Sequence, residues 1–151
     1  MRLFAICATP PPAHAHYRRS RRSIQLVIAS IPDWGVAKQH TQKILDAAQK
    51  SLDDIAYLYL VPFRTRGDAG STMDQAYLDA GYSRHLVQQL RAVAPKIIIA
   101  IDRPSERAAH RYRREAPHTN VIYYTRKRDA HAERAKTLAV LSLQCVNNGN
   151  R

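Results

Sequence analysis

Hydrophobic residues along this chain form short runs that alternate with longer amphipathic segments. The clearest run is Ile97-Ile98-Ile99-Ala100-Ile101, in which no polar residue interrupts the apolar ones. A strand with this pattern is covered on both faces, as in the middle of a parallel sheet. It follows a segment, residues 84–94, in which Leu86, Leu90 and Val93 recur at helical spacing. The pattern predicts a helix, a break at Pro95-Lys96 and then a buried strand.

The same alternation extends over the chain from residue 24 onward. Strands are predicted at residues 24–29, 55–61, 96–101 and 120–125, and helices at 36–52, 84–94, 104–115 and 130–143, with a short helical piece at 75–80 inside a loop over 67–81. Within the first helix we expect one buried face made of Ile44, Ala47, Ala48 and Leu52, and we expect residues 147–150 to fray. Strands that alternate with helices indicate a parallel sheet. We therefore predict a three-layer α/β/α sandwich with a central, mostly parallel sheet of four or five strands.

Residues 1–23 do not fit this alternation. Pro10-Pro11-Pro12 disfavours both helix and sheet, and Arg18-Arg19-Ser20-Arg21-Arg22 is a block of positive charge with no acidic residue before Asp33. We predict a basic N-terminal arm over residues 1–23, suited to lie along a phosphate backbone, followed by a single α/β domain over 24–151. An organellar transit-like segment is the alternative, because such segments are also rich in arginine and poor in acids.

The net charge narrows the class of partner. The chain carries 24 Lys and Arg against 12 Asp and Glu, a formal charge of +12. A concentrated basic surface favours a polyanion, most often DNA or RNA, although an acidic protein, a membrane surface or a merely solubilising charge stay as alternatives. No apolar stretch reaches the ~20 residues of a membrane span. Cys7 and Cys145 are two distant cysteines and make no disulfide framework, which favours a reducing compartment such as the cytoplasm.

Charged and aromatic residues follow all four predicted strands, and because parallel strands end at one edge, we expect them to line one cationic cleft. They are Asp33 and Trp34, then Phe63, Arg64 and Arg66, then Asp102 and Arg103, then Arg126, Lys127 and Arg128. Arg and Lys neutralise phosphates, Trp34 and Phe63 offer faces for a base, and Asp33 or Asp102 is placed to activate a water. Each has a structural alternative: helix N-caps for the two acids, core packing for the aromatics, and a solvated charge run at 126–128.

Three further arginines, Arg107, Arg111 and Arg114, recur at helical spacing and share one face of the helix over 104–115. Like charges at this spacing repel, so an anionic partner would compensate them; the alternative pairs them with Glu106 or Glu115. The predicted nucleic-acid-binding set is therefore Arg18, Arg19, Arg21, Arg22, Trp34, Phe63, Arg64, Arg66, Arg103, Arg107, Arg111, Arg114, Arg126, Lys127 and Arg128.

Familiar cofactor and nucleophile motifs are missing from the sequence. The segment Gly67-Asp68-Ala69-Gly70-Ser71-Thr72 lacks the lysine of a Walker loop, which leaves a small anion nest as its alternative use. No Cys/His quartet has metal-binding spacing, and no Ser or Cys has the surroundings of an activated nucleophile. We therefore expect no metal and no cofactor.

Several segments resemble the uracil-DNA glycosylase superfamily over roughly residues 24–143. The similar segments are Leu26–Asp33, Leu58–Arg64, Val93–Ile101 and Asn120–Arg126. The resemblance implies hydrolysis of the glycosidic bond of a flipped base in DNA repair: Asp33 would orient the water, Phe63 or Trp34 would stack on the base, and Arg126 or Lys127 would stabilise the departing base anion.

The chain departs from that family at its characteristic positions. Tyr59 stands where the family has the uracil-reading Asn, Asp102 stands in place of a Gly, and the loop histidine is replaced by Thr125, Arg126 or Lys127. The resemblance therefore implies a reduced, motif-divergent member. The sequence favours a protein that binds nucleic acid through a cationic strand-end cleft without catalysis. A glycosylase-like hydrolase and a binder of a nucleotide or other small anion are the alternatives.

Overall fold

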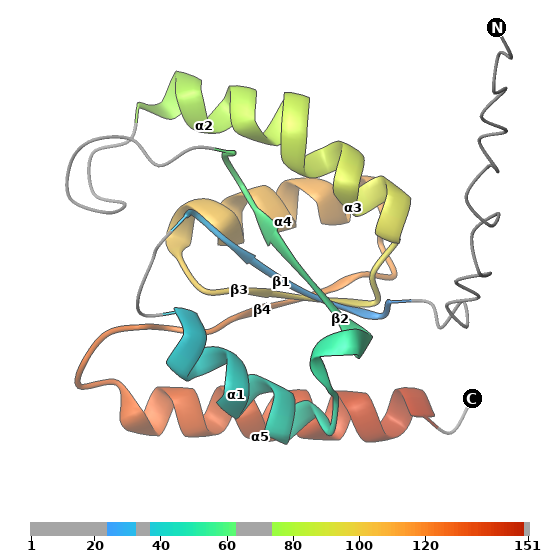
Figure 1. Ribbon diagram of the computed structural model, residues 1–151, viewed down its shortest axis with the longest axis vertical. Helices are drawn as coiled ribbons and strands as arrows, with labels where there is room; N and C mark the ends of the chain where they lie inside the picture. Colours follow the sequence, from blue (N-terminus) through green and yellow to red (C-terminus); the bar gives the residue numbers. More distant parts are fainter. Residues whose placement is uncertain (1–23, 33–36, 63–73, 150–151) are drawn as a thin grey trace, which may run out of the picture.

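The protein folds around a four-stranded sheet in which every strand runs parallel to its neighbours (Figure 1). This computed structural model describes residues 24–32, 37–62 and 74–149. The strands are β1 (Leu26–Ser30), β2 (Ile55–Tyr59), β3 (Ile97–Ala100) and β4 (Asn120–Tyr123), in the spatial order β2-β1-β3-β4. This is the order of a doubly wound sheet, and the chain reverses its direction of travel across the sheet between β1 and β3. The predicted α/β sandwich is confirmed, with four strands in the described residues.

Helices cover both faces of the sheet. One face carries α1 (Ala37–Ala48) and α5 (His131–Gly149), and the other carries α2 (Gln75–Gly81), α3 (Val87–Val93) and α4 (Arg103–Glu115) (Figure 1). The apolar character of β3, and of β1 up to Ser30, follows from this arrangement, because both strands lie inside the sheet and every residue of each is buried.

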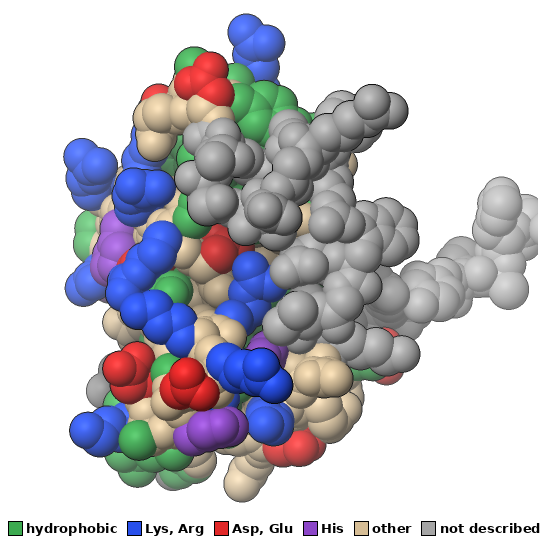
Figure 2. All heavy atoms as spheres, turned by 90° about the vertical axis from the view of Figure 1, so that its left-hand side faces the viewer, with side chains coloured by type: hydrophobic (Ala, Val, Ile, Leu, Met, Phe, Trp, Pro, Cys, Tyr) green, Lys and Arg blue, Asp and Glu red, His purple; other side chains and the backbone are tan. Residues whose placement is uncertain are grey.

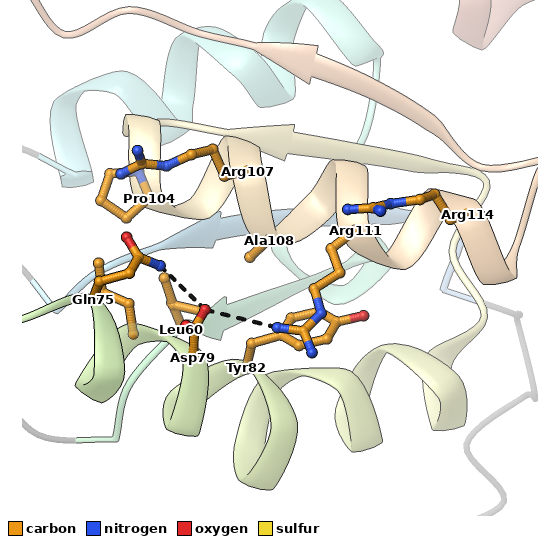
Figure 3. A pocket seen from close by; sticks show the side chains of 10 residues that line it. Leu60, Gln75, Asp79, Tyr82, Pro104, Arg107, Ala108, Arg111 and Arg114 are labelled. Carbon is orange, nitrogen blue, oxygen red and sulfur yellow. Dashed lines mark hydrogen bonds and ion pairs between the residues drawn. The ribbon is translucent and has the colours of Figure 1, made fainter.

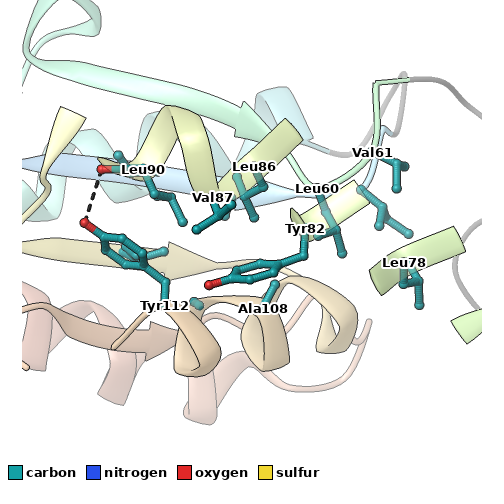
Figure 4. Packing of buried hydrophobic residues seen from close by; sticks show 14 residues of the cluster. Leu60, Val61, Leu78, Tyr82, Leu86, Val87, Leu90, Ala108 and Tyr112 are labelled. Atoms are coloured by element: carbon teal, nitrogen blue, oxygen red, sulfur yellow. Dashed lines mark hydrogen bonds between the residues drawn. The ribbon is translucent and has the colours of Figure 1, made fainter. Parts of the chain in front are cut away.

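Alternate residues of β1 point into two separate cores. Val27 and Ala29 pack with the helices α2, α3 and α4, while Leu26 and Ile28 pack with α1 and α5. Figure 4 shows the first core, in which the Tyr112 hydroxyl donates a hydrogen bond to the Leu90 carbonyl at 3.2 Å. That bond satisfies the one polar atom that this ring brings into the core.

The segment from residue 75 to 93 is continuous helix, where the sequence predicts a loop with a short helical piece and then a separate helix. Helix α2 begins at its N-cap Asp74 and passes through a π-helical turn, η2 (Tyr82–Leu86), directly into α3. Gly81 is helical and buried, so it does not mark a turn. The helix ends at Ala94, which has a left-handed φ of 48°, just before Pro95, as the predicted break requires.

Two predictions about helix ends are wrong. Helix α1 stops at Ala48, and Leu52 lies in the short 3₁₀ turn η1 (Leu52–Asp54) with 70% of its surface exposed, so it does not share the buried face of α1. Helix α5 continues to Gly149, through residues that the sequence predicts to fray. Its length is supported by packing along α1, with Leu141 buried and Cys145 partly buried in the same core.

Candidate nucleic-acid interface

The four strand ends meet at one edge of the sheet, as their parallel direction predicts. The hydrogen-bond ladder continues one residue past β2, β3 and β4: Leu60 donates to the Ser30 carbonyl at 2.8 Å, Ile101 to Ala29 at 3.1 Å and Tyr124 to Ala100 at 2.8 Å. Neighbouring strand exits are therefore bonded directly to one another. Asp102, Arg103 and the segment 125–128 follow these exits and extend over the edge.

Asp102 lies at this edge with 8% of its surface exposed. Its Oδ1 accepts a hydrogen bond from the backbone N–H of Ser105 at 2.8 Å, and its Oδ2 accepts one from Ile31 at 2.8 Å. The first bond caps the N-terminus of α4, and the second ties that helix to the end of β1. Because backbone groups engage both carboxylate oxygens, the geometry favours the helix-cap alternative for Asp102 over the activation of a water.

Basic side chains gather over the carboxyl-terminal edge, and Figure 2 views the molecule from this side. Arg103 contacts the ring of Tyr123, with its guanidinium carbon 3.9 Å from the ring centroid, and pairs with Glu106 at 2.6 Å. Arg126 Nε donates to the Ile101 carbonyl at 3.1 Å. Lys127 and Arg128 are exposed beyond it.

Buried Arg134 of α5 shapes the loop that carries Lys127 and Arg128. Its guanidinium donates to the carbonyl of Lys127 and, at 3.5 Å, to the carbonyl of Arg128, and only 7% of its surface is exposed. The guanidinium of Arg134 is therefore engaged with the backbone of the loop and is not exposed to a ligand. The consequence is a loop whose two basic side chains are presented to solvent from an anchored backbone.

The predicted arginine face of α4 lines a groove between α4 and α2 (Figure 3). The groove has a volume of about 310 Å³, and its polar lining consists of Arg107, Arg111, Arg114, Gln75, Asp79 and Tyr82. The alternative that pairs these arginines with neighbouring glutamates is wrong: Glu106 pairs with Arg103 and Glu115 with Arg91. Arg111 instead lies 3.7 Å from Asp79 of α2.

A second polar cluster lies at the same edge on the α1 side of the sheet. Ser30 Oγ and the Tyr57 hydroxyl are 3.1 Å apart, and His40 Nδ1 and the Tyr124 hydroxyl are 3.1 Å apart. Burial lowers the pKa of His40, and the positive charges of Arg134, Lys43 and Arg126 lower it further. Burial also raises the pKa of Tyr57. His40 therefore favours its neutral form in a strongly positive setting.

The sequence predictions missed several residues that line these places. Asp79 lies in the short helical piece predicted at residues 75–80, and Tyr82 lies between that piece and the helix predicted at 84–94, although their spacing of three residues is a helical signal. The contacts of His40 with Tyr124 and of Ser30 with Tyr57 form only through the tertiary fold. The predicted Asp33, Trp34, Phe63, Arg64, Arg66, the arm over 1–23, and the Gly67–Thr72 segment lie outside the described residues.

The described part of the chain contains no cluster of three or more His, Cys, Asp or Glu side chains arranged to hold a metal ion. None of its helices combines the length and the apolar character that crossing a membrane requires. Cys145 is a free thiol.

No model of a known protein family matches this sequence, and a search of curated proteins finds no significant match. The resemblance to uracil-DNA glycosylases therefore stays a prediction, and the functional inference rests on the geometry of the cationic edge and groove.

Proposed function

We propose that this protein binds nucleic acid through the cationic face formed by the carboxyl-terminal edge of the sheet and the adjoining arginine groove of α4. The observation that carries the proposal is the concentration of Lys and Arg side chains on that face (Figure 2). Nucleic-acid backbones carry a dense line of negative charge, and cations that neutralise phosphates supply most of the sequence-independent affinity.

The fold supports this use because several basic side chains on this face are exposed and make no ion pair with another described residue. Lys127 and Arg128 are exposed on a loop that Arg134 anchors. Within the described residues, neither Arg107 nor Arg114 takes part in an ion pair. Phosphates of a bound strand would therefore meet cations that are exposed to solvent and that no carboxylate of the described residues neutralises.

The geometry favours binding over catalysis. Asp102 is the acidic residue that directly follows a strand in the described part of the edge, and both of its oxygens accept backbone hydrogen bonds. A carboxylate held in this way orders the ends of β1 and α4, and both of its oxygens are directed at backbone N–H groups of the protein itself.

A salt titration of binding to labelled DNA and RNA oligonucleotides tests the proposal. We expect the logarithm of the binding constant to fall linearly with the logarithm of salt concentration between about 50 and 200 mM, with a slope that reports several phosphate contacts. An affinity that does not change over this range, or no binding to either polymer at low salt, would contradict it.

A further inference from the structure

The centre of the α2–α4 groove holds an arginine whose plane is fixed on one side (Figure 3). The guanidinium carbon of Arg111 lies 4.3 Å from the centroid of the Tyr82 ring, and that tyrosine is 96% buried, with 4% of its surface exposed. Asp79 Oδ1 lies 3.7 Å from Arg111 Nη1 and also accepts a 3.1 Å hydrogen bond from Gln75 Nε2. Tyr82 and Asp79 therefore hold the guanidinium plane in place.

The opposite face of Arg111 is open to the groove. Its side chain keeps 46% of its surface exposed although one face lies on Tyr82. A planar, ordered guanidinium with one free face is a platform on which a nucleobase stacks, as arginine planes do in proteins that bind unpaired nucleotides. The π-helical turn that begins at Tyr82 is a feature often found at functional sites.

Two further arginines flank the platform along α4. Arg107 and Arg114 are seven residues apart, so helix geometry separates their backbones by roughly 10.5 Å at ~1.5 Å per residue. Both side chains line the groove, and neither makes an ion pair with another described residue.

Asp79 favours different positions in the groove for a phosphate and for a base. Its carboxylate is 59% exposed and offsets the charge of the neighbouring Arg111, so the middle of the groove attracts a phosphate less than Arg107 and Arg114 do, while an uncharged base meets no such difference. Phosphates are thereby directed to the ends, where Arg107 and Arg114 lie, and a base to the centre.

We infer that the α2–α4 groove binds single-stranded nucleic acid, with one base stacked on Arg111 and the neighbouring backbone phosphates contacted by Arg107 and Arg114. This inference rests on the proposed function and names its substrate class. In a duplex, neighbouring bases cover each base face, so the Arg111 platform has nothing to stack on. The groove volume of about 310 Å³ lies at the lower end of the range typical of small-ligand sites, which suits one nucleotide unit.

The test compares Arg111→Lys with the matched control Arg113→Lys in the full chain. Arg113 is exposed on the same helix and does not line the groove, and both substitutions keep the positive charge. The probes are a fluorescein-labelled single-stranded oligonucleotide and the duplex of the same sequence. We expect Arg111→Lys to weaken single-strand binding by roughly tenfold, the effect of losing one stacked base, and to leave duplex binding unchanged. Arg113→Lys should change neither.

A second variant tests the phosphate contacts. Arg107→Ala combined with Arg114→Ala should lower the salt slope of single-strand binding by about 1.4, since each lost phosphate contact removes about 0.7. Equal losses for the two lysine variants, or equal losses on single strand and duplex, would overturn the groove inference and leave the proposed function standing. Failure of the wild-type protein to bind either probe would instead overturn the proposed function.

Discussion

The Asp102 carboxylate accepts a hydrogen bond from the backbone N–H of Ile31, a residue 71 positions earlier in the chain, at 2.8 Å. Its other oxygen caps α4 through Ser105. The same side chain therefore fixes the exit of β1 against the start of the helix that carries the arginine groove. Its position at the topological switch point places this connection where doubly wound sheets bind their ligands.

Asp102→Ala should destabilise the protein by about 2–4 kcal/mol. The loss combines about 1 kcal/mol for the missing helix cap with about 1–3 kcal/mol for leaving the buried N–H of Ile31 without a partner. Asp102→Asn should cost less, because an amide oxygen still caps the helix. Urea unfolding measures both changes. The exposed Asp129, which follows the strand-end loop, provides the control Asp129→Asn. Equal stability of the Asp102 and Asp129 variants would show that the two hydrogen bonds contribute nothing.

Gly81 of α2 is a second position with a specific structural role, because its surroundings leave no room for a side chain. A Cβ atom there would lie 2.5 Å from Val61 Cγ1 and 2.6 Å from the Leu60 carbonyl oxygen. Gly81→Ala should therefore destabilise the protein by about 1–3 kcal/mol, although alanine favours an exposed helix by about 1 kcal/mol over glycine. The control is Ser83→Ala, at an exposed position two residues further on, which should change the free energy of unfolding little. A more stable Gly81→Ala protein would contradict the close approach of α2 to the end of β2.

His40 should make stability depend on pH in the range just below neutrality. Burial and the nearby cations lower its pKa below the ordinary value of 6.5. As the pH falls through 6.5, the unfolded chain takes up a proton at His40 that the folded protein resists, so the free energy of unfolding decreases. Above that pH both states carry a neutral His40 and its full contribution to stability is present.

Urea unfolding at about pH 7.5 and about pH 5.5 measures this linkage. His40→Gln should lose less stability than the wild-type protein between the two conditions. His118→Gln, at an exposed position between α4 and β4, should lose as much as the wild type. If all three proteins lose the same amount, His40 is not responsible for the pH dependence.

The sequence predicted the sheet well because its central strands are covered on both faces. Ile97–Ala100 is apolar throughout since β3 lies inside the sheet, and Pro95 marks the end of the preceding helix because proline restricts the residue before it. The direction of the strands then placed Asp102, Arg103 and Arg126 at one edge.

Other features depend on tertiary contacts that no local pattern encodes. Gly81 resembles the end of a loop in the sequence, but the structure uses it inside a helix because the Leu60 carbonyl approaches too closely for a side chain. The helical spacing of Arg107, Arg111 and Arg114 can be recognised in the sequence. Asp79, which pairs with Arg111, comes from a different helix. Local spacing therefore identified the cationic face, and only the fold identified the groove that this face lines with α2.

The most direct measurement of the central claim compares charge removal at the two opposite edges of the sheet. Lys127→Ala with Arg128→Ala removes two exposed cations from the carboxyl-terminal edge, and Lys50→Ala with Lys96→Ala removes two from the amino-terminal edge. Near 0.1 M salt, the first pair should weaken oligonucleotide binding by roughly tenfold or more and lower the salt slope by about 1–2. The second pair should leave both nearly unchanged. Equal losses from both pairs would contradict the account, because affinity would then follow net charge and not the carboxyl-terminal face.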